Sequence, residues 1–157
     1  MPISGISTDY TGRTKDIHIF QGVDPRSTKV ITPEFGKISN FCTGIQKLVQ
    51  RYAICLLTEL GSQELSPTFG TTLLTNLNNR SLSLNRVDIY PIFNVANAKV
   101  VREFRQFQAK NPSLPDDEKL NTALLEDVVL ISDQVQLQVK IYPIATPSVT
   151  FTVPLPK

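Results

Sequence analysis

The chain of 157 residues has one histidine, two cysteines and a net charge of only +2. A Ser–His–Asp triad needs a positioned imidazole base, and a zinc site needs three or four nitrogen, sulfur or carboxylate ligands. The small net charge argues against a polybasic surface for nucleic acid or anionic lipid. No apolar run reaches the roughly 18 residues that a bilayer-spanning helix needs.

Signals for phosphate binding and secretion are absent as well. The sequence contains neither Gly-x-Gly-x-x-Gly nor a glycine-rich loop followed by Lys-Ser or Lys-Thr. Residues 1–5 lack the charged start and apolar run of a signal peptide, so none is predicted. We therefore expect no cofactor, no metal, no nucleic acid and no membrane among the ligands of this chain.

The single histidine is interpreted as a structural or surface residue, and the two cysteines are interpreted as structural. His18 lies in a predicted strand with no nucleophile motif beside it. Cys42 and Cys55 fall in one predicted helix, which would separate them by roughly 20 Å. That separation is too great for a disulfide, so we predict buried free thiols in a reducing cytoplasm.

The length predicts one main domain, since domains average about 150 residues. Residues 1–37 are polar and loop-like, and they are interpreted as an N-terminal arm; residues 38–157 form the domain. Within the arm, residues 16–20 alternate weakly and predict a short strand. A second short strand is predicted around Val30 and Ile31, stopped by Pro33.

Apolar residues at spacings of three and four predict a buried helix over 41–60, with Ser39 or Asn40 as N-cap and Gly61 as C-cap. A short helix is predicted over 70–79. A long helix is predicted over 82–109, with Pro91 either in its first turn or at a bend.

The long helix has an apolar stripe in which Asn97 is a polar exception. A further short helix is predicted over 116–125, because acidic residues at 116–118 suit a helix N-terminus.

The last thirty residues change from helical period to strict alternation. Residues 134–141 alternate polar and apolar, residues 148–153 do the same, and the two runs predict a hairpin. Residues 128–131 are a third strand candidate. The predicted fold class is α+β: three to four helices, then a small antiparallel sheet with a C-terminal hairpin, and a short N-terminal strand.

The second strand of the hairpin has an unusual composition for a strand at the end of a sheet. Its five residues favour β-structure and carry no charge: Val149, Thr150, Phe151, Thr152 and Val153. At a sheet edge such a strand offers unpaired backbone groups to a partner strand. The alternative, a strand paired on both sides within its own sheet, is left open.

Three segments resemble one known family. Residues 44–52 (GIQKLVQRY), 56–62 (LLTELGS) and 67–71 (PTFGT) resemble the short baseplate wedge protein of contractile-tailed bacteriophages. This lysozyme-like family also includes TssE of type VI secretion baseplates. The resemblance covers roughly residues 38–155.

The shared motif is interpreted as scaffold rather than catalyst. Thr58 and Gly61 would end the helix and reverse the chain. Pro67 and Gly70 would frame Phe69, which would pack beside the helix at 41–60. A tight helix–loop–helix corner needs these residue types whatever the function of the protein.

The resemblance implies a structural, non-enzymatic subunit of the virion, located in the tail baseplate and assembled in the cytoplasm of the bacterial host. It implies six copies, and as partners the other wedge proteins and the tail sheath, with the tube initiator as a further candidate. The 134–153 hairpin would initiate the sheath by pairing with its strands, and Val149, Phe151 and Val153 would set the register.

The resemblance also implies a contact with the wedge core. The family carries Glu-Pro-Arg just before its C-terminal sheet, and this segment docks on the core bundle of the wedge. We align that motif with residues 126–128. Glu126 matches the glutamate of the motif, while Asp127 and Val128 replace its proline and its arginine.

Two other functions stay as alternatives. One is a peptidoglycan-hydrolysing baseplate enzyme that uses Glu59 or Glu126, although the sequence does not show that any two carboxylates face each other across a cleft. The other is an adaptor or neck protein that caps the tail tube instead of the sheath.

Overall fold

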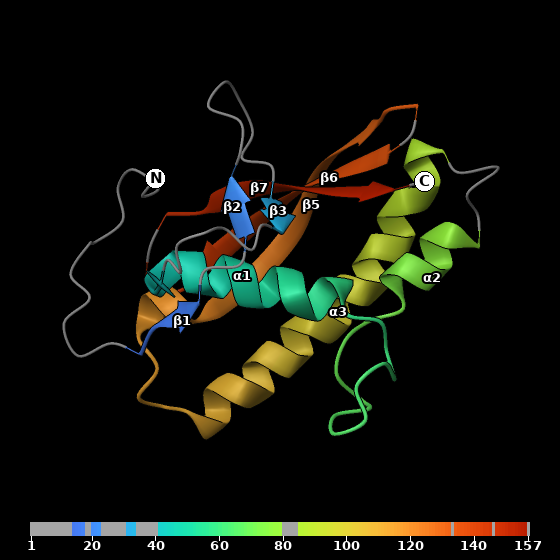
Figure 1. Cartoon of the computed structure of the whole chain (residues 1–157). Helices are drawn as coiled ribbons and strands as arrows, with labels where there is room; N and C mark the ends of the chain where they lie inside the picture. The colour runs from blue at the N-terminus through green and yellow to red at the C-terminus, as the bar shows by residue number, and fades with distance from the viewer. Residues whose placement is uncertain are drawn as a thin grey trace.

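A computed structural model describes residues 14–17, 20–22, 31–33, 41–79, 85–132, 134–145 and 147–156. His18 and the expected helix caps Ser39 and Asn40 lie outside the described residues. Figure 1 shows the arrangement: helices α1 and α3 cross each other and pack against a three-stranded sheet.

The first helix is shorter than the periodicity predicted. α1 spans Gly44–Leu57, with Thr43 in extended conformation as N-cap and Thr58 as C-cap. Gly61 is therefore not the helix cap that the sequence predicted. It has a φ of +82° and lies in the turn that follows, where the Ser62 amide donates to the Glu59 carbonyl over 3.1 Å.

The other two helices follow the predicted segments with shifted ends. α2 spans Leu73–Asn78 and α3 spans Arg86–Lys110. The side chain of Asn85 caps α3 by accepting from the Asp88 amide over 3.0 Å. Pro91 lies in the second turn of α3, so the helix lacks one backbone hydrogen bond there.

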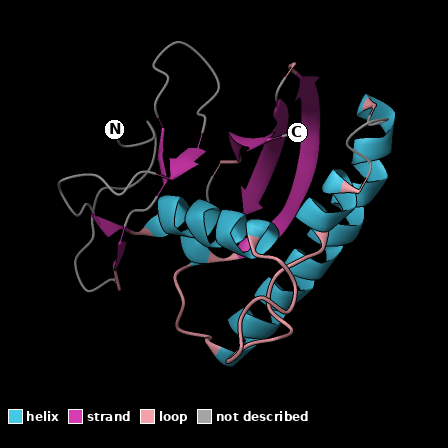
Figure 2. Ribbon diagram, turned by 45° about the vertical axis from the view of Figure 1, so that its right-hand side comes forward, coloured by secondary structure: helices cyan, strands magenta, loops and turns pink. Residues whose placement is uncertain are grey.

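The C-terminal sheet confirms the predicted α+β class and the predicted hairpin. β5 (Leu120–Leu130), β6 (Gln134–Pro143) and β7 (Val149–Pro156) are antiparallel, in the order β5-β6-β7. β6 and β7 pair without a shift from Gln134↔Pro156 to Ile141↔Val149. Figure 2 distinguishes these strands, in magenta, from the helices, in cyan.

The predicted helix over 116–125 is wrong. Only Asp116–Glu118 form a single turn of 3₁₀ helix, η1, and β5 begins at Leu120. The candidate strand at 128–131 is the end of this longer strand. The register of β5 against β6 shifts between Leu120 and Thr122 and between Leu125 and Asp127. Each shift interrupts the alternation of faces, which hides the strand from a period-two search.

Two short antiparallel pairs involve strands of the N-terminal arm. β1 (Asp16–Ile17) pairs with β4 (Phe41–Cys42). The sequence predicted that a helix would begin at the residues that form β4. β2 (Phe20–Gly22) pairs with β3 (Ile31–Pro33), which confirms strands close to the predicted positions. β3 lies near β7 (Figure 1), but within the described residues the two belong to separate sheets.

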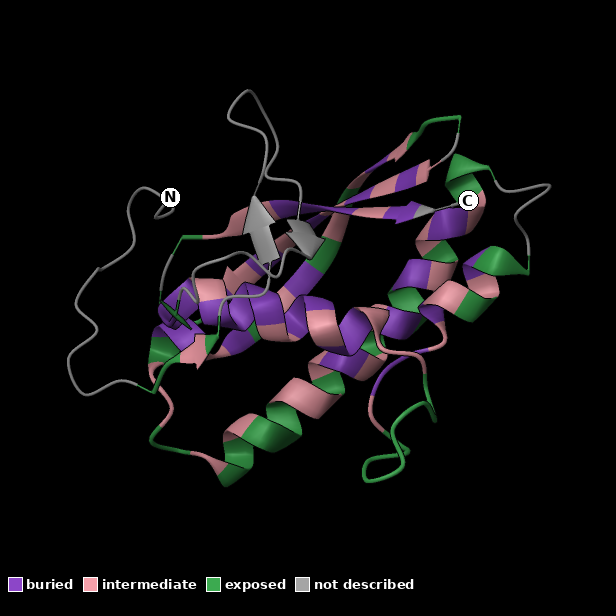
Figure 3. Ribbon diagram, in the orientation of Figure 1, coloured by how far each residue is buried: buried purple, intermediate pink, exposed green. Residues whose placement is uncertain are grey.

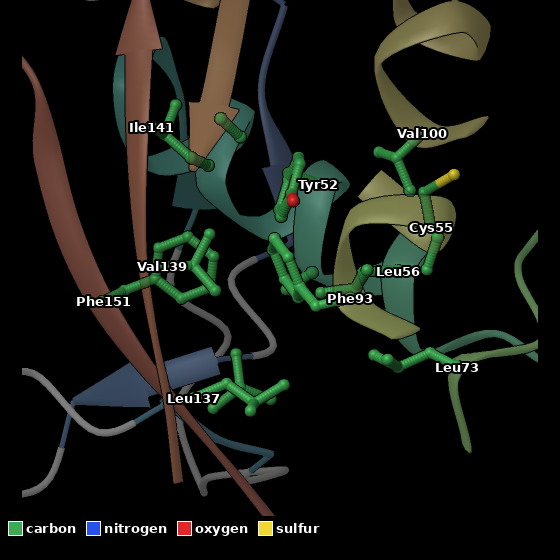
Figure 4. Close-up of a cluster of buried hydrophobic side chains, with 14 of the residues drawn as sticks. Tyr52, Cys55, Leu56, Leu73, Phe93, Val100, Leu137, Val139, Ile141 and Phe151 are labelled. Atoms are coloured by element: carbon green, nitrogen blue, oxygen red, sulfur yellow. The ribbon is translucent and has the colours of Figure 1, made fainter. Parts of the chain in front are cut away.

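The core lies between the helices and one face of the three-stranded sheet. Figure 3 shows buried residues along α1, on one side of α3 and at alternate positions of the strands. Figure 4 shows Tyr52 of α1, Phe93 of α3 and Phe151 of β7 in one cluster of buried side chains. The rings of Tyr52 and Phe151 pack edge to face, with centroids 6.0 Å apart.

The polar exception in the long helix has a structural reason. The Tyr52 hydroxyl donates to Oδ1 of Asn97 over 2.7 Å, and Nδ2 of Asn97 donates to the Ala123 carbonyl over 2.7 Å. Asn97 thus satisfies a buried hydroxyl of α1 and a backbone carbonyl of β5 together. Burial raises the pKa of Tyr52, so this hydroxyl stays protonated and acts as a donor.

Candidate functional site

The candidate partner-binding strand β7 is the end strand of the sheet. Among the described residues it pairs with β6 only, and β3, which lies near it, belongs to a separate sheet with β2. An antiparallel edge strand directs the backbone groups of alternate residues away from its neighbour. β7 has no charged residue from Val149 to Pro156, so no charge discourages another strand from pairing there.

The side chains of β7 divide between the core and the opposite face. Phe151 and Val153 are buried in the core, and Val149 packs partly buried against it. That Val149, Phe151 and Val153 set the register of a partner strand stays a prediction. Phe151 and Val153 turn their side chains into the core of the same chain. A partner strand would therefore be held mainly by backbone hydrogen bonds.

On the opposite face only one of the predicted residues has a partly accessible side chain. Thr150 is partly exposed, and its hydroxyl donates to Oε2 of Glu126 over 2.9 Å. Thr152 is buried, and its hydroxyl has no hydrogen-bond partner among the described residues. Of the five predicted residues, Thr150 is thus the position at which a substitution can alter the edge and leave the core untouched.

Glu126 is not located where the family motif was expected. It lies inside β5, on the outer face of the sheet, instead of just before the sheet. Oε1 of Glu126 also forms an ion pair with Nζ of Lys140, 3.2 Å away. The hydrogen bond from Thr150 and the Lys140 ammonium lower the pKa of Glu126, so this carboxylate is ionised and paired.

The glutamate that directly precedes the sheet is Glu118, which the sequence analysis did not single out as a site residue. Its buried Oε1 accepts from the Thr43 hydroxyl at 3.0 Å and from the Gly44 amide at 3.1 Å. Its Oε2 lies 3.0 Å from Nζ of Lys47, and both side chains are 2 % exposed. A carboxylate at this place satisfies the free Gly44 amide at the N-terminus of α1 and neutralises a buried ammonium.

The same helix fixes the start of the described chain. Nζ of Lys47 donates to the Thr14 hydroxyl over 2.7 Å, and Nε2 of Gln50 donates to the Ile17 carbonyl over 2.8 Å. Arg51 pairs with Asp16 over 3.2 Å. Three side chains of α1 thus anchor residues 14–17 to the main domain.

The residues of the shared motif form one corner between α1 and α2. Gly70 has a φ of +95°, and a Cβ there would overlap the Thr58 carbonyl oxygen. Pro67 lies in an exposed turn in which the Phe69 amide donates to the Ser66 carbonyl over 3.0 Å. Phe69 packs partly buried against the core, as expected. The corner therefore has a structural role, and only Gly70 has no room for a side chain.

Two residues that the sequence analysis did not single out hold this corner closed. The Thr71 hydroxyl donates to the Leu56 carbonyl over 2.7 Å, and its amide donates to the Thr58 carbonyl over 2.8 Å. Nζ of Lys99, on α3, donates to the carbonyls of Thr68 and Gly70. The Lys99 contact joins segments that are far apart in sequence, so no local pattern indicates it.

The two cysteines are free and buried, as predicted. Cys42 lies in β4, however, and not in the helix that contains Cys55. Burial is the main reason that the pKa of each thiol rises to about 11. Both are protonated at neutral pH and therefore poor nucleophiles.

Two further kinds of site were considered in the described part of the chain. Its cysteine and acidic residues form no group that could hold a metal ion. None of its helices combines the length and the hydropathy of a membrane-spanning segment.

Comparisons with known proteins do not assign the chain to a family. No family model, no curated protein and no solved structure matches it. The functional argument therefore rests on the residues and the geometry described above, together with the resemblance of three sequence segments.

Proposed function

We propose that this chain is a structural subunit of the baseplate wedge of a contractile phage tail, and that β7 initiates the sheath by accepting one of its strands. The observation that carries the proposal is the position of β7 at the end of the sheet order, without charge along its length. In this proposal the protein is a virion component that binds other wedge proteins and the sheath.

The core geometry supports a rigid template at this edge. Phe151, Val153 and Leu155 are at most 5 % exposed, and β6 pairs with β7 along eight residues without a shift. A strand held this firmly presents its outer backbone groups in a fixed register, which lowers the entropy lost when a partner strand is added.

A single strand pair binds weakly, and the symmetry that the family implies compensates for this. Six copies around a tail tube would offer six edges to one ring of sheath subunits. Neighbouring contacts then raise the effective concentration, so the ring binds more tightly than any single pair. The proposal therefore predicts weak binding by the isolated chain and strong binding by the assembled baseplate.

The peptidoglycan-hydrolase alternative is less well supported by the described carboxylates. A general acid in glycoside hydrolysis needs a raised pKa, whereas the pKa of Glu126 is lowered. Glu59 is only partly exposed, and its Oε1 accepts from the Thr75 hydroxyl over 2.7 Å. Zymography of the Glu59→Gln and Glu126→Gln variants tests this alternative, which requires clearing that one of the substitutions abolishes.

A neck or adaptor role makes a different prediction about partners. Such a protein would copurify with tail tube protein, whereas the proposed sheath initiator would copurify with sheath protein. Tagged chain from assembled tails distinguishes the two outcomes.

The sharpest test changes the edge and spares the core. Deleting β7 is unsuitable, because deletion removes buried core residues and disrupts the fold. Thr150→Lys adds a charge at the edge, beside the carboxylate of Glu126. Gln136→Lys adds the same charge on the same face of the central strand β6 and serves as the control.

The expected result is that Thr150→Lys baseplates start sheaths at least about tenfold less often than wild-type baseplates, as counted by electron microscopy. Gln136→Lys baseplates should start sheaths normally. Equal nucleation by the two variants, with both incorporated into baseplates, contradicts the proposal.

A further inference from the structure

A groove of about 550 Å³ runs between the C-terminal half of α3 and the start of β5. Its α3 wall includes Ala98, Arg102, Arg105 and Ala109, and Thr122 belongs to the β5 wall. It lies at the opposite edge of the sheet from β7, because β5 and β7 are the two end strands.

The charge of this groove is not compensated from within the described chain. Arg102 and Arg105 are exposed, and neither guanidinium forms an ion pair with a described residue. No acidic residue lines the groove. At the other end of α3, by contrast, Arg86 forms an ion pair with Asp127. A partner that supplies carboxylates would therefore complete an arrangement that the chain leaves open.

The spacing of the α3 residues suits a helical partner. One face of α3 carries residues 98, 102, 105 and 109 over three turns. The distance along the helix axis from the first to the last of them is roughly 16 Å. Alanine at both ends of this stripe allows a second helix to approach closely, and ridges-into-grooves packing then fills the space between them.

We infer that this groove binds an acidic amphipathic helix of another wedge protein. Its apolar side would fill the groove, and carboxylates at the margin of that side would pair with Arg102 and Arg105. The identification of the partner as a wedge protein rests on the proposed function, whereas the chemistry of the helix rests on the groove itself. With sheath at β7 and this helix at α3, the subunit would hold two partners at opposite edges of one sheet.

The test uses the full chain and a synthetic probe. The probe is a fluorescein-labelled amphipathic helical peptide with leucines along one side and glutamates at both margins. Its control has glutamine at every glutamate position. Fluorescence anisotropy measures the affinity, and amide NMR shifts locate the bound peptide.

Two doubly substituted chains with the same change in charge isolate the groove. Arg102→Glu/Arg105→Glu reverses the groove arginines. Lys15→Glu/Lys110→Glu reverses two exposed lysines that do not line the groove. We expect the groove variant to bind the glutamate probe at least about tenfold more weakly than wild type, and the control to stay within about twofold. The shifts should concentrate at Ala98, Ala109 and Thr122.

Equal binding by the two variants overturns the inference, as does the absence of saturable binding by the wild-type chain or a shift map centred elsewhere. The readout is independent of the proposed function. If sheath initiation fails while the probe binds the groove, the proposed function falls and the helix-binding groove remains. If sheath initiation occurs as proposed while the groove does not bind the probe, the helix-binding groove falls and the proposed function remains.

Discussion

The two edges of the three-stranded sheet differ in almost every feature that controls strand pairing. At the β5 edge, the Gln108 side chain bonds both the amide and the carbonyl of Leu120, at 3.0 and 3.2 Å, and Asn97 bonds the Ala123 carbonyl. β5 also carries Glu126 and Asp127 and changes register twice against β6. β7 has no charge and no register shift, and no α3 side chain bonds to its backbone within the described chain.

Charges, bulges and covering elements are the usual means by which proteins prevent unwanted pairing at sheet edges. β5 uses all three. β7 has neither a charge nor a register shift, while β3 lies near it and two prolines, Pro154 and Pro156, lie near its end. In our proposal, this difference protects β5 against foreign strands and leaves β7 available for one.

The largest expected effect separates the two faces of β7. Phe151→Ala should lower the free energy of unfolding by about 3–5 kcal/mol, because it removes a buried ring that packs on Tyr52. Thr150→Ala should cost less than about 1 kcal/mol, since it removes one hydrogen bond of a partly exposed residue. Urea unfolding measures both values. Similar losses of unfolding free energy for the two variants would show that the outer face of β7 also stabilises the fold.

A slightly smaller effect is expected at the start of the β5 edge, which Glu118 anchors to α1. Glu118→Gln should cost about 3 kcal/mol or more, because the buried Lys47 ammonium loses its counter-charge. The double variant Lys47→Met/Glu118→Leu should cost less than the single one in the same urea assay. A larger loss in the double variant would contradict this account of the pair.

The protection of β5 predicts a milder change in association. Glu126→Val should increase self-association, because it makes the outer face of β5 more like that of β7. Glu64→Val, which removes an exposed acid from a loop, is the matched control. Sedimentation velocity over a range of concentrations compares the two variants. Identical profiles would show that the charge of Glu126 does not account for the difference between the two edges.

The smallest expected effect concerns pH. Because the folded state lowers the pKa of Glu126, its bonds to Thr150 and Lys140 stabilise the fold above the usual glutamate range. This contribution should be lost as the pH falls through the lowered pKa. An NMR titration of the Glu126 carboxyl should show its midpoint moving up in Thr150→Val, and an unchanged midpoint would exclude the hydroxyl as the main cause.

The local patterns of the sequence predicted the elements whose period is regular. The α1 stripe and the alternation of β6 and β7 each follow one period, so the helix and the hairpin were predicted correctly. β5 was missed because its buried residues Leu120, Ala123 and Val128 do not alternate, a consequence of the two register shifts.

The strand that carries the candidate site was predicted, but not the contacts of its side chains. Composition identified β7 as an uncharged strand, yet it could not show that Phe151 and Val153 face the core of the same chain. The contact of Glu118 with Lys47 links distant segments, and acidic residues at 116–118 resemble a helix start. Long-range pairing of this kind has no local signature in one sequence.

Amide hydrogen exchange along β7, measured with and without sheath protein, tests most directly whether this strand is open to a partner. We expect alternate amides of β7 to exchange slowly in the free chain, where they pair with β6, and the intervening amides to exchange quickly. Sheath protein should then slow the fast set. Uniformly slow exchange in the free chain, or a fast set that sheath protein leaves unchanged, would contradict the account.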